Sequence, residues 1–286
     1  MRLVPVVSIA VFCITGIFFL NGCGRHKVET IRISGSTTIS SFIRKAIDEY
    51  GKNVPQVTFS VTSHGSLDGI DALLSDSADI AMSSAEITPE QIAAAKKKEI
   101  SLKAFLLGYD VIVPIVNKAN IVDNITFSQL KDVYAGTTLR WSALGGADTV
   151  IDVVDRGTTS GTHAVWHHAL GDVVSDSVIT TTESGSNSSV LAYVAEHANS
   201  IGYISAAYLN PDVKALNLDG MKIDHNDSLL SQYHLKRPLL LYVNEAGLTR
   251  EMKSFIMYLI FNDHGKALLK EAGFFSVYSW PLEVYH

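Results

Sequence analysis

Four hydroxyl-rich turns are the groups in this sequence that are best suited to bind a ligand. Each follows a short apolar stretch, and they are Ser36-Thr37-Thr38, Ser66, Ser83-Ser84 and Ser160-Gly161-Thr162. Free N–H groups at a helix start carry partial positive charge and bind anions. Serine and threonine hydroxyls add hydrogen-bond donors beside these N–H groups, and glycine lets the backbone approach a ligand closely. Arg156 supplies a full positive charge on a planar fork that matches a tetrahedral oxyanion.

Each turn also has a simple structural interpretation. A single Ser or Thr before a helix is usually only an N-cap, whose side chain accepts from a backbone N–H of the first turn. A shared site is favoured by their repetition at strand ends, because ligands of open α/β sheets collect at the carboxyl ends of the strands. Spacing alone leaves both interpretations open.

The elements that must position these turns alternate between strand-like and helix-like apolar patterns. This alternation predicts an α/β fold with mostly parallel sheets. We expect strands at 31–34, 57–61, 79–82, 106–116, 149–155, 201–205 and 239–243. We expect helices over 39–50, after Ser66, after Thr88, after Thr126, from His163, and over 252–259 and 265–271. Thr88 with Gln91 and Thr126 with Gln129 form capping boxes, and Gly136 is the expected stop after the second.

The N-terminal residues read as an export signal. Residues 3–20 are apolar apart from Ser8 and Thr15, and they lead into Leu20-Asn21-Gly22-Cys23. A small residue before a cysteine resembles the lipobox of bacterial lipoproteins, which implies a signal peptide over 1–23 and lipidation of Cys23. An uncleaved anchor is the alternative, since the apolar stretch can barely span a bilayer. Either interpretation places the rest of the chain outside the cytoplasm and holds it to a membrane.

Charge and cysteine content exclude several classes. The net charge of −6 argues against nucleic acid and anionic lipid surfaces as partners. Cys13 lies in the apolar signal and Cys23 is the lipidation site, so no thiol remains for a disulfide or a metal. About 260 residues follow, enough for two α/β lobes with their own cores. We expect no cofactor.

Several motifs together resemble the phosphate-binding proteins of ABC transporters. The resemblance runs in order along nearly the whole chain after Cys23, through 35–39, 65–66, 79–84, 113–118, 136–141 with 145–146, 156–162 and 201–205. The most specific parts are Arg156 with Ser160-Gly161-Thr162 and the strand-ending Ser83-Ser84.

This resemblance implies the fold, the site and the partners. The fold would be a two-lobed periplasmic-binding-protein type II fold, with mixed sheets flanked by helices and a ligand cleft between the lobes. Lobe I would comprise 28–111 and 236–286, and lobe II 112–235, with the hinge near 111–116 and 235–239. The ligand-binding residues would be Ser36, Thr37, Thr38, Ser66, Ser84, Arg156, Ser160, Gly161 and Thr162. The chain would be a monomeric lipoprotein, in the periplasm or on the outer face of the cell membrane, that delivers inorganic phosphate to ABC permease subunits.

Two departures bear on the ligand. Some family members carry an aspartate where Ser84 stands, and others an arginine where Ala85 stands. The aspartate accepts the proton of phosphate and so rejects sulfate. Asp110 and Asp68 are candidates for that role here. Sensing or binding of another oxyanion or small ligand is the alternative function.

Three other signals point elsewhere. His163 and His167 have the i,i+4 spacing of a metal pair and His168 follows, but no HExxH pattern occurs, so we expect packing or surface roles. The loop 157–162 lacks the lysine of a nucleotide-binding P-loop. Ser160 near His163 suggests a serine hydrolase or phosphoester enzyme, but the GxSxG elbow is missing, so we do not expect an enzyme.

Overall fold

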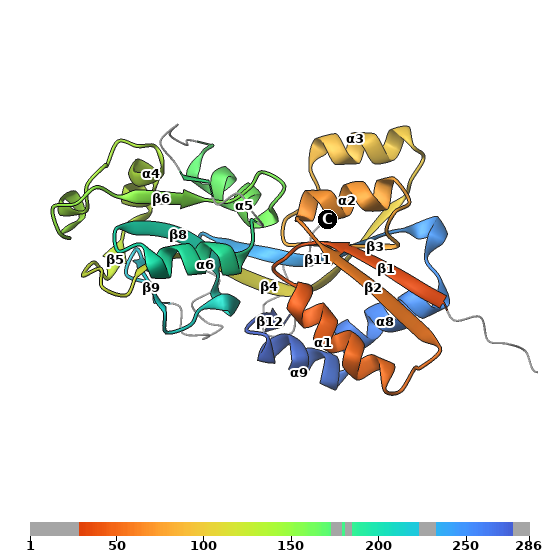
Figure 1. Ribbon diagram of the computed structural model, residues 1–286. Helices are drawn as coiled ribbons and strands as arrows, with labels where there is room; N and C mark the ends of the chain where they lie inside the picture. The colour runs from red at the N-terminus through yellow and green to blue at the C-terminus, as the bar shows by residue number, and fades with distance from the viewer. Residues whose placement is uncertain (1–28, 173–178, 181–184, 223–232, 277–286) are drawn as a thin grey trace, which may run out of the picture.

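The computed structural model describes residues 29–172, 179–180, 185–222 and 233–276. The chain forms two bodies joined by two long strands (Figure 1). Because residues 1–28 are outside this range, the expected signal peptide and Cys23 are outside it too. None of the helices in the described part of the chain combines the length and apolarity that crossing a bilayer requires.

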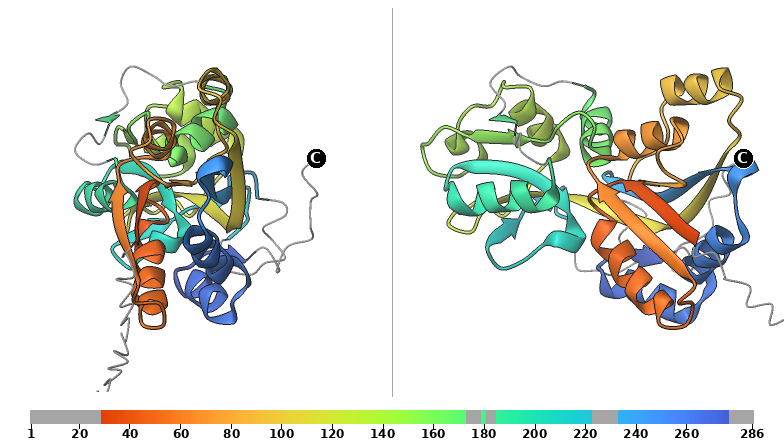
Figure 2. Two further views of the ribbon diagram at one scale, coloured as in Figure 1. Left: turned by 90° about the vertical axis from the view of Figure 1, so that its right-hand side faces the viewer. Right: turned by 45° about the vertical axis from the view of Figure 1, so that its right-hand side comes forward.

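The first body, on the right in Figure 1, holds the beginning and the end of the described chain. Its elements are β1 (Glu29–Gly35), α1 (Ser40–Gly51), β2 (Val57–Ser63), α2 (Ser66–Leu74), β3 (Ile80–Ser83), α3 (Pro89–Lys97), η3 (Glu245–Gly247), α8 (Arg250–Phe261), α9 (Asp263–Glu271) and β12 (Phe275–Ser276). Strands β2, β1 and β3 are parallel neighbours. Helices α1, α8 and α9 lie on one side of this sheet, and α2 and α3 lie on the other (Figure 2).

The second body is built from the middle of the chain. Its elements are β5 (Asn124–Ile125), α4 (Phe127–Tyr134), η1 (Trp141–Leu144), β6 (Asp152–Asp155), α5 (Gly161–Leu170), β7 (Ile179–Thr180), α6 (Asn187–Glu196), β8 (Ser200–Ser205), η2 (Ala206–Tyr208), β9 (Val213–Ala215) and β10 (Asn217–Leu218). Strand β6 is parallel to β7 and β8. Consecutive residues of β8 face opposite layers: Gly202 faces α6, while the ring of Tyr203 stacks on Trp166 of α5 at 4.1 Å between centroids.

One strand, β4, belongs to both bodies, and β11 lies beside it at the junction. Strand β4 (Leu102–Asn117) pairs with β11 (Lys236–Asn244) along its first part and with β8 along its last part, antiparallel in both cases. Strand β11 also pairs with β3, so the main sheet runs in the order β2-β1-β3-β11-β4-β8-β6-β7. The α/β class with mixed sheets, which the resemblance implied, is therefore confirmed. The mostly parallel pairing expected from the alternation of elements is not, because β4 and β11 pair antiparallel with their neighbours.

The buried hydrophobic residues form separate clusters in the two bodies. One large cluster fills the second body around Trp141, Trp166 and Tyr203, and another fills the first body around Phe42 and Phe255. Along β11 the side chains alternate between two layers. Those of 239, 241 and 243 enter the Phe42 cluster, and those of 240 and 242 enter a small cluster under α2.

The local signals identified helix ends better than strand ends. Both capping boxes form, and Gly136 follows α4 with a positive φ of 71°. The helix expected from His163 begins two residues earlier, at Gly161, because Ser160 is its N-cap. The strand expected over 106–116 extends over Leu102–Asn117, and the one expected over 149–155 is confined to Asp152–Asp155. Cross-strand partners set these limits, and a single-sequence pattern does not contain them.

Candidate anion-binding site

The hydroxyl-rich turns of the first body meet at the carboxyl ends of β1 and β3. The Ser36 hydroxyl donates to Ser84 Oγ at 3.0 Å, and the hydroxyls of Ser66 and Ser84 lie 3.3 Å apart. The backbone N–H of Ser84 donates to Ser66 Oγ at 3.1 Å. All three side chains are buried. Parallel pairing of β1 with β3 brings the two strand ends together, so residues 48 positions apart become neighbours.

The N-terminus of α5 contributes from the second body. Ser160 is its N-cap, with a side chain that accepts from the backbone N–H of His163 at 3.3 Å. The Thr162 hydroxyl lies 3.4 Å from that of Thr38, at the entry to α1. Gly161 faces the first body so closely that a Cβ placed there would lie 2.3 Å from Ser66 Oγ. Two helix N-termini, those of α2 and α5, therefore meet across the two bodies.

Arg156 lies at the centre of these turns. It follows β6 directly and is 2% exposed. Its Nη1 donates to Thr162 Oγ1 at 2.5 Å, its Nη2 donates to Thr37 Oγ1 at 3.1 Å, and its Nε donates to the Gly185 carbonyl at 2.6 Å. Burial lowers the pKa of Arg156 to about 10, so the guanidinium remains a cation at neutral pH.

A second buried arginine, Arg237 of β11, completes the site and was missed by the sequence analysis. Its Nη1 donates to Thr162 Oγ1 at 2.6 Å and to Ser84 Oγ at 3.2 Å, and its Nη2 donates to Thr38 Oγ1 at 3.2 Å. Asp110 of β4 holds it in place, accepting from Nη2 at 2.7 Å and from Nε at 2.9 Å. Arg237 and Asp110 face each other in the β11–β4 ladder, so strand pairing positions the guanidinium.

Asn187 and Tyr208 were also missed. Asn187 is the first residue of α6, and its Nδ2 donates to Thr38 Oγ1 at 3.2 Å while its Oδ1 accepts from Arg156 Nη1 at 3.3 Å. The Tyr208 hydroxyl lies 3.0 Å from the carbonyl oxygen of Thr37. Ser186 with Ser189 forms a capping box that marks the start of α6, but a serine-rich helix start has no feature that singles out Asn187.

The nine residues expected to bind the ligand therefore lie together, drawn from both bodies. Of the two carboxylates considered as proton acceptors, only Asp110 contacts the site. Its Oδ2 accepts from Arg237 and its Oδ1 accepts from the Ser205 hydroxyl at 2.7 Å. Asp68 is half-buried in the first turn of α2, outside this network of hydrogen bonds.

Charge in the site is unbalanced. Two guanidinium groups are buried, and burial also raises the pKa of Asp110, although Arg237 and Ser205 favour its ionised form. Within the described residues, Asp110 ion-pairs with Arg237, while no carboxylate lies within ion-pair distance of the Arg156 guanidinium. A buried cation without a counter-charge is costly. Donors, helix N-termini and excess positive charge together fit one class of molecule, the proteins that enclose a small anion between two α/β bodies.

Comparison with known proteins agrees with this class. A family model described as a PBP superfamily domain matches residues 24–263, and the chain belongs to this family. The phosphate-binding protein PstS of Borreliella burgdorferi is 25% identical over 287 residues, which cover 95% of this chain and 98% of the relative. PstS of Bacillus subtilis is 28% identical over 264 residues, covering 89% and 83%.

Solved structures give the same result. A chain from Clostridium perfringens, solved with bound phosphate, superposes with a TM-score of 0.80 at 28% identity and covers 87% of this chain and all of its own length. An ABC-type phosphate transport receptor from Vibrio cholerae gives 0.71 at 28% identity, with coverage of 87% and 100%. The family resemblance and the fold class expected from the motifs are confirmed.

Proposed function

We propose that this protein captures inorganic phosphate outside the cytoplasm and delivers it to an ABC importer. The observation that carries the proposal is the buried Arg156 guanidinium, which has no carboxylate partner among the described residues and is surrounded by hydroxyl groups from both bodies. An anion supplies the missing counter-charge. The curated relatives named as phosphate-binding proteins support phosphate as that anion.

Each predicted ligand-binding residue has a role in this proposal. Arg156 and Arg237 pair with anion oxygens in place of the Thr162 hydroxyl that both now contact. The backbone N–H groups of Gly161 and Thr162 bind at the helix start capped by Ser160. The hydroxyl-bearing turns of the first body, which comprise Ser36, Thr37, Thr38, Ser66 and Ser84, donate from the opposite side.

Serine hydroxyls also explain how a protonated anion is accepted. A hydroxyl donates one hydrogen bond and accepts others, whereas a carboxylate only accepts. Both oxygens of Asp110 are engaged by Arg237 and Ser205. We therefore propose that the protonated oxygen of phosphate donates its hydrogen bond to the buried hydroxyls near Ser84. We expect this site to reject sulfate less strongly than a site with a free carboxylate would.

The two bodies act as lobes in this proposal. Lobe I is 28–111 with 236–286 and lobe II is 112–235, and the chain passes between them through β4 and β11. Closure excludes water and strengthens each hydrogen bond to the anion. We further propose that Cys23 carries the lipid anchor, that the protein is a monomer, and that ABC permease subunits receive the ligand.

Ser160 and His163, the pair that suggested a hydrolase, do not have the arrangement of a nucleophile and its base in the described part of the chain. The Ser160 hydroxyl accepts from the backbone N–H of His163, while the His163 ring lies against His167 and Asp155. A serine nucleophile needs a base within hydrogen-bond reach of its hydroxyl. We therefore propose binding without catalysis, and we expect no turnover of a phosphoester.

Calorimetric titration with phosphate, sulfate, molybdate and small carboxylates tests the function. We expect phosphate to bind at micromolar dissociation constants or tighter, corresponding to about −8 kcal/mol. Arg156→Ala should weaken binding at least about a hundredfold, because a buried charge-assisted contact is lost. Arg140→Ala is the control, since this arginine pairs with Asp148 at the surface. Full affinity in Arg156→Ala would reject the site, and preference for another ligand would reject phosphate.

A further inference from the structure

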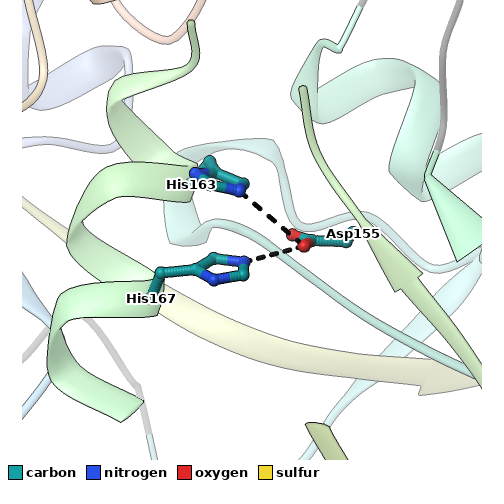
Figure 3. Close-up of side chains that lie close together, drawn as sticks. All are labelled: Asp155, His163 and His167. Atoms are coloured by element: carbon teal, nitrogen blue, oxygen red, sulfur yellow. Dashed lines mark hydrogen bonds and ion pairs between the residues drawn. The ribbon is translucent and has the colours of Figure 1, made fainter. Parts of the chain in front are cut away.

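A second polar cluster, formed by Asp155, His163 and His167, lies beside the anion-binding residues in the chain. Asp155 is the last residue of β6, and His163 and His167 lie one turn apart on α5. Both imidazole rings point from α5 toward the Asp155 carboxylate (Figure 3). The His167 Nε2 lies 2.7 Å from Asp155 Oδ2, and the His163 Nε2 lies 3.8 Å from the same oxygen.

The distances within this cluster would allow its three side chains to coordinate one metal ion. One nitrogen or oxygen from each of the three residues lies within 4.8 Å of the others. Around a tetrahedral zinc-type ion, neighbouring ligand atoms lie about 3.3 Å apart, given bond lengths of about 2.0–2.1 Å. The contact of 2.7 Å would therefore widen slightly and that of 3.8 Å would shorten, changes within the reach of side-chain rotation.

The carboxylate is already oriented for such a role. Asp155 Oδ1 accepts from the backbone N–H of Arg156 at 2.7 Å and from the Tyr203 hydroxyl. These bonds fix the plane of the carboxylate and direct Oδ2 to the two histidines. Metal-binding carboxylates and histidines commonly have such outer hydrogen bonds, which hold the ligand atom in place.

Packing alone accounts for only part of the arrangement. A single hydrogen bond from His167 would satisfy Asp155 Oδ2, yet His163 brings a further nitrogen to the same oxygen at a distance too long for a hydrogen bond. The two rings stack with centroids 3.8 Å apart. The His163 side chain is 17% exposed, which gives an ion a route from solvent.

We propose that Asp155, His163 and His167 form a binding site for a divalent transition-metal ion of the zinc class. Two imidazole nitrogens and one carboxylate oxygen suit zinc better than magnesium or calcium, which prefer oxygen ligands. A water molecule takes the fourth position on the exposed side. The ion fastens β6 to α5, the two elements that carry Arg156 and the Ser160–Thr162 helix start.

The test titrates ZnCl2 into the metal-free full chain without phosphate. We expect one-site binding at micromolar dissociation constants or tighter, with a rise in melting temperature because the ion binds the folded chain. Cobalt(II) should bind at the same site and give the visible absorption bands of a four-coordinate ion. His163→Ala should weaken zinc binding at least about tenfold and remove those bands.

Two controls keep the result interpretable. His168→Ala changes the exposed neighbour on the same helix and should leave zinc binding unchanged. His163→Ala should retain the phosphate affinity of the unaltered chain, which shows that it is folded and separates this inference from the proposed function. Equal zinc affinity in the His163→Ala and unaltered chains would overturn the inference, since binding would then lie elsewhere among the 10 histidines. Absence of zinc binding to the unaltered chain would overturn it as well.

Discussion

At the scale of single residues, Gly161 lies at a point where the two bodies approach each other closely in the site. A Cβ at this position would lie 2.3 Å from Ser66 Oγ and 2.8 Å from Ser84 Oγ, distances that real side chains do not tolerate. Both hydroxyls belong to the opposite body. The absence of a side chain therefore allows the start of α5 to reach the turns of the first body.

Gly161→Ala should weaken phosphate binding at least about tenfold, because about 1.4 kcal/mol of steric cost suffices for that loss. The matched control is Gly157→Ala in the same loop, where a Cβ would meet nothing within 4 Å. Calorimetry on the two variants measures the difference. Equal affinities would show that the two bodies need not approach so closely when the anion binds.

Residue patterns in the sequence identified some site residues and not others, for a physical reason. Hydroxyl-rich turns such as Ser36-Thr37-Thr38 are local signals, since the turn and the following helix start are adjacent in the chain. Arg237 stands beside an apolar run, and its role arises from Asp110, which is 127 positions away and meets it only in the β4–β11 ladder. Asn187 depends in the same way on Arg156 and Thr38. Such partnerships are tertiary, and one sequence does not contain them.

At the scale of elements, the β4–β11 pair places one full ion pair at the junction of the two bodies. Asp110 and Arg237 are directly opposite in register and are 0% and 1% exposed. An intact ion pair this deeply buried adds little to the free energy of unfolding, because removing both charges from water is costly. The loss of one partner, however, leaves the other charge buried without compensation.

Arg237→Met should lower the free energy of unfolding by about 3–5 kcal/mol, because Asp110 is then left buried and unpaired. The double variant Asp110→Leu with Arg237→Met should recover most of that stability, while phosphate affinity stays lost in both. Denaturant unfolding and calorimetry give the two quantities. A double variant that binds phosphate normally would remove Arg237 from the site.

At the scale of the whole molecule, the protein is acidic, and the positive charge for an anion comes only from groups next to the proposed site. The net charge is −6, yet two guanidinium groups and the N-termini of α2 and α5 face the proposed ligand. Because these charges are buried, dissolved salt screens them much less than it screens charges on the surface.

Phosphate affinity should therefore change less than about threefold between about 0.1 M and about 1 M NaCl, although the Debye length falls from about 10 Å to about 3 Å. Titration at the two salt concentrations checks this expectation. A loss of affinity comparable to that of surface-bound anions would mean that the ligand binds at an exposed patch rather than at Arg156.

The length of β4 has a consequence for how this chain acquires its structure. Its first residues complete the sheet of one body and its last residues complete the sheet of the other. If either body were produced as a separate fragment, it would lose a strand or keep one with a bare hydrogen-bonding edge, the kind of surface on which chains aggregate. We therefore expect the two cores to unfold as one cooperative unit, with the stability of each body dependent on the other.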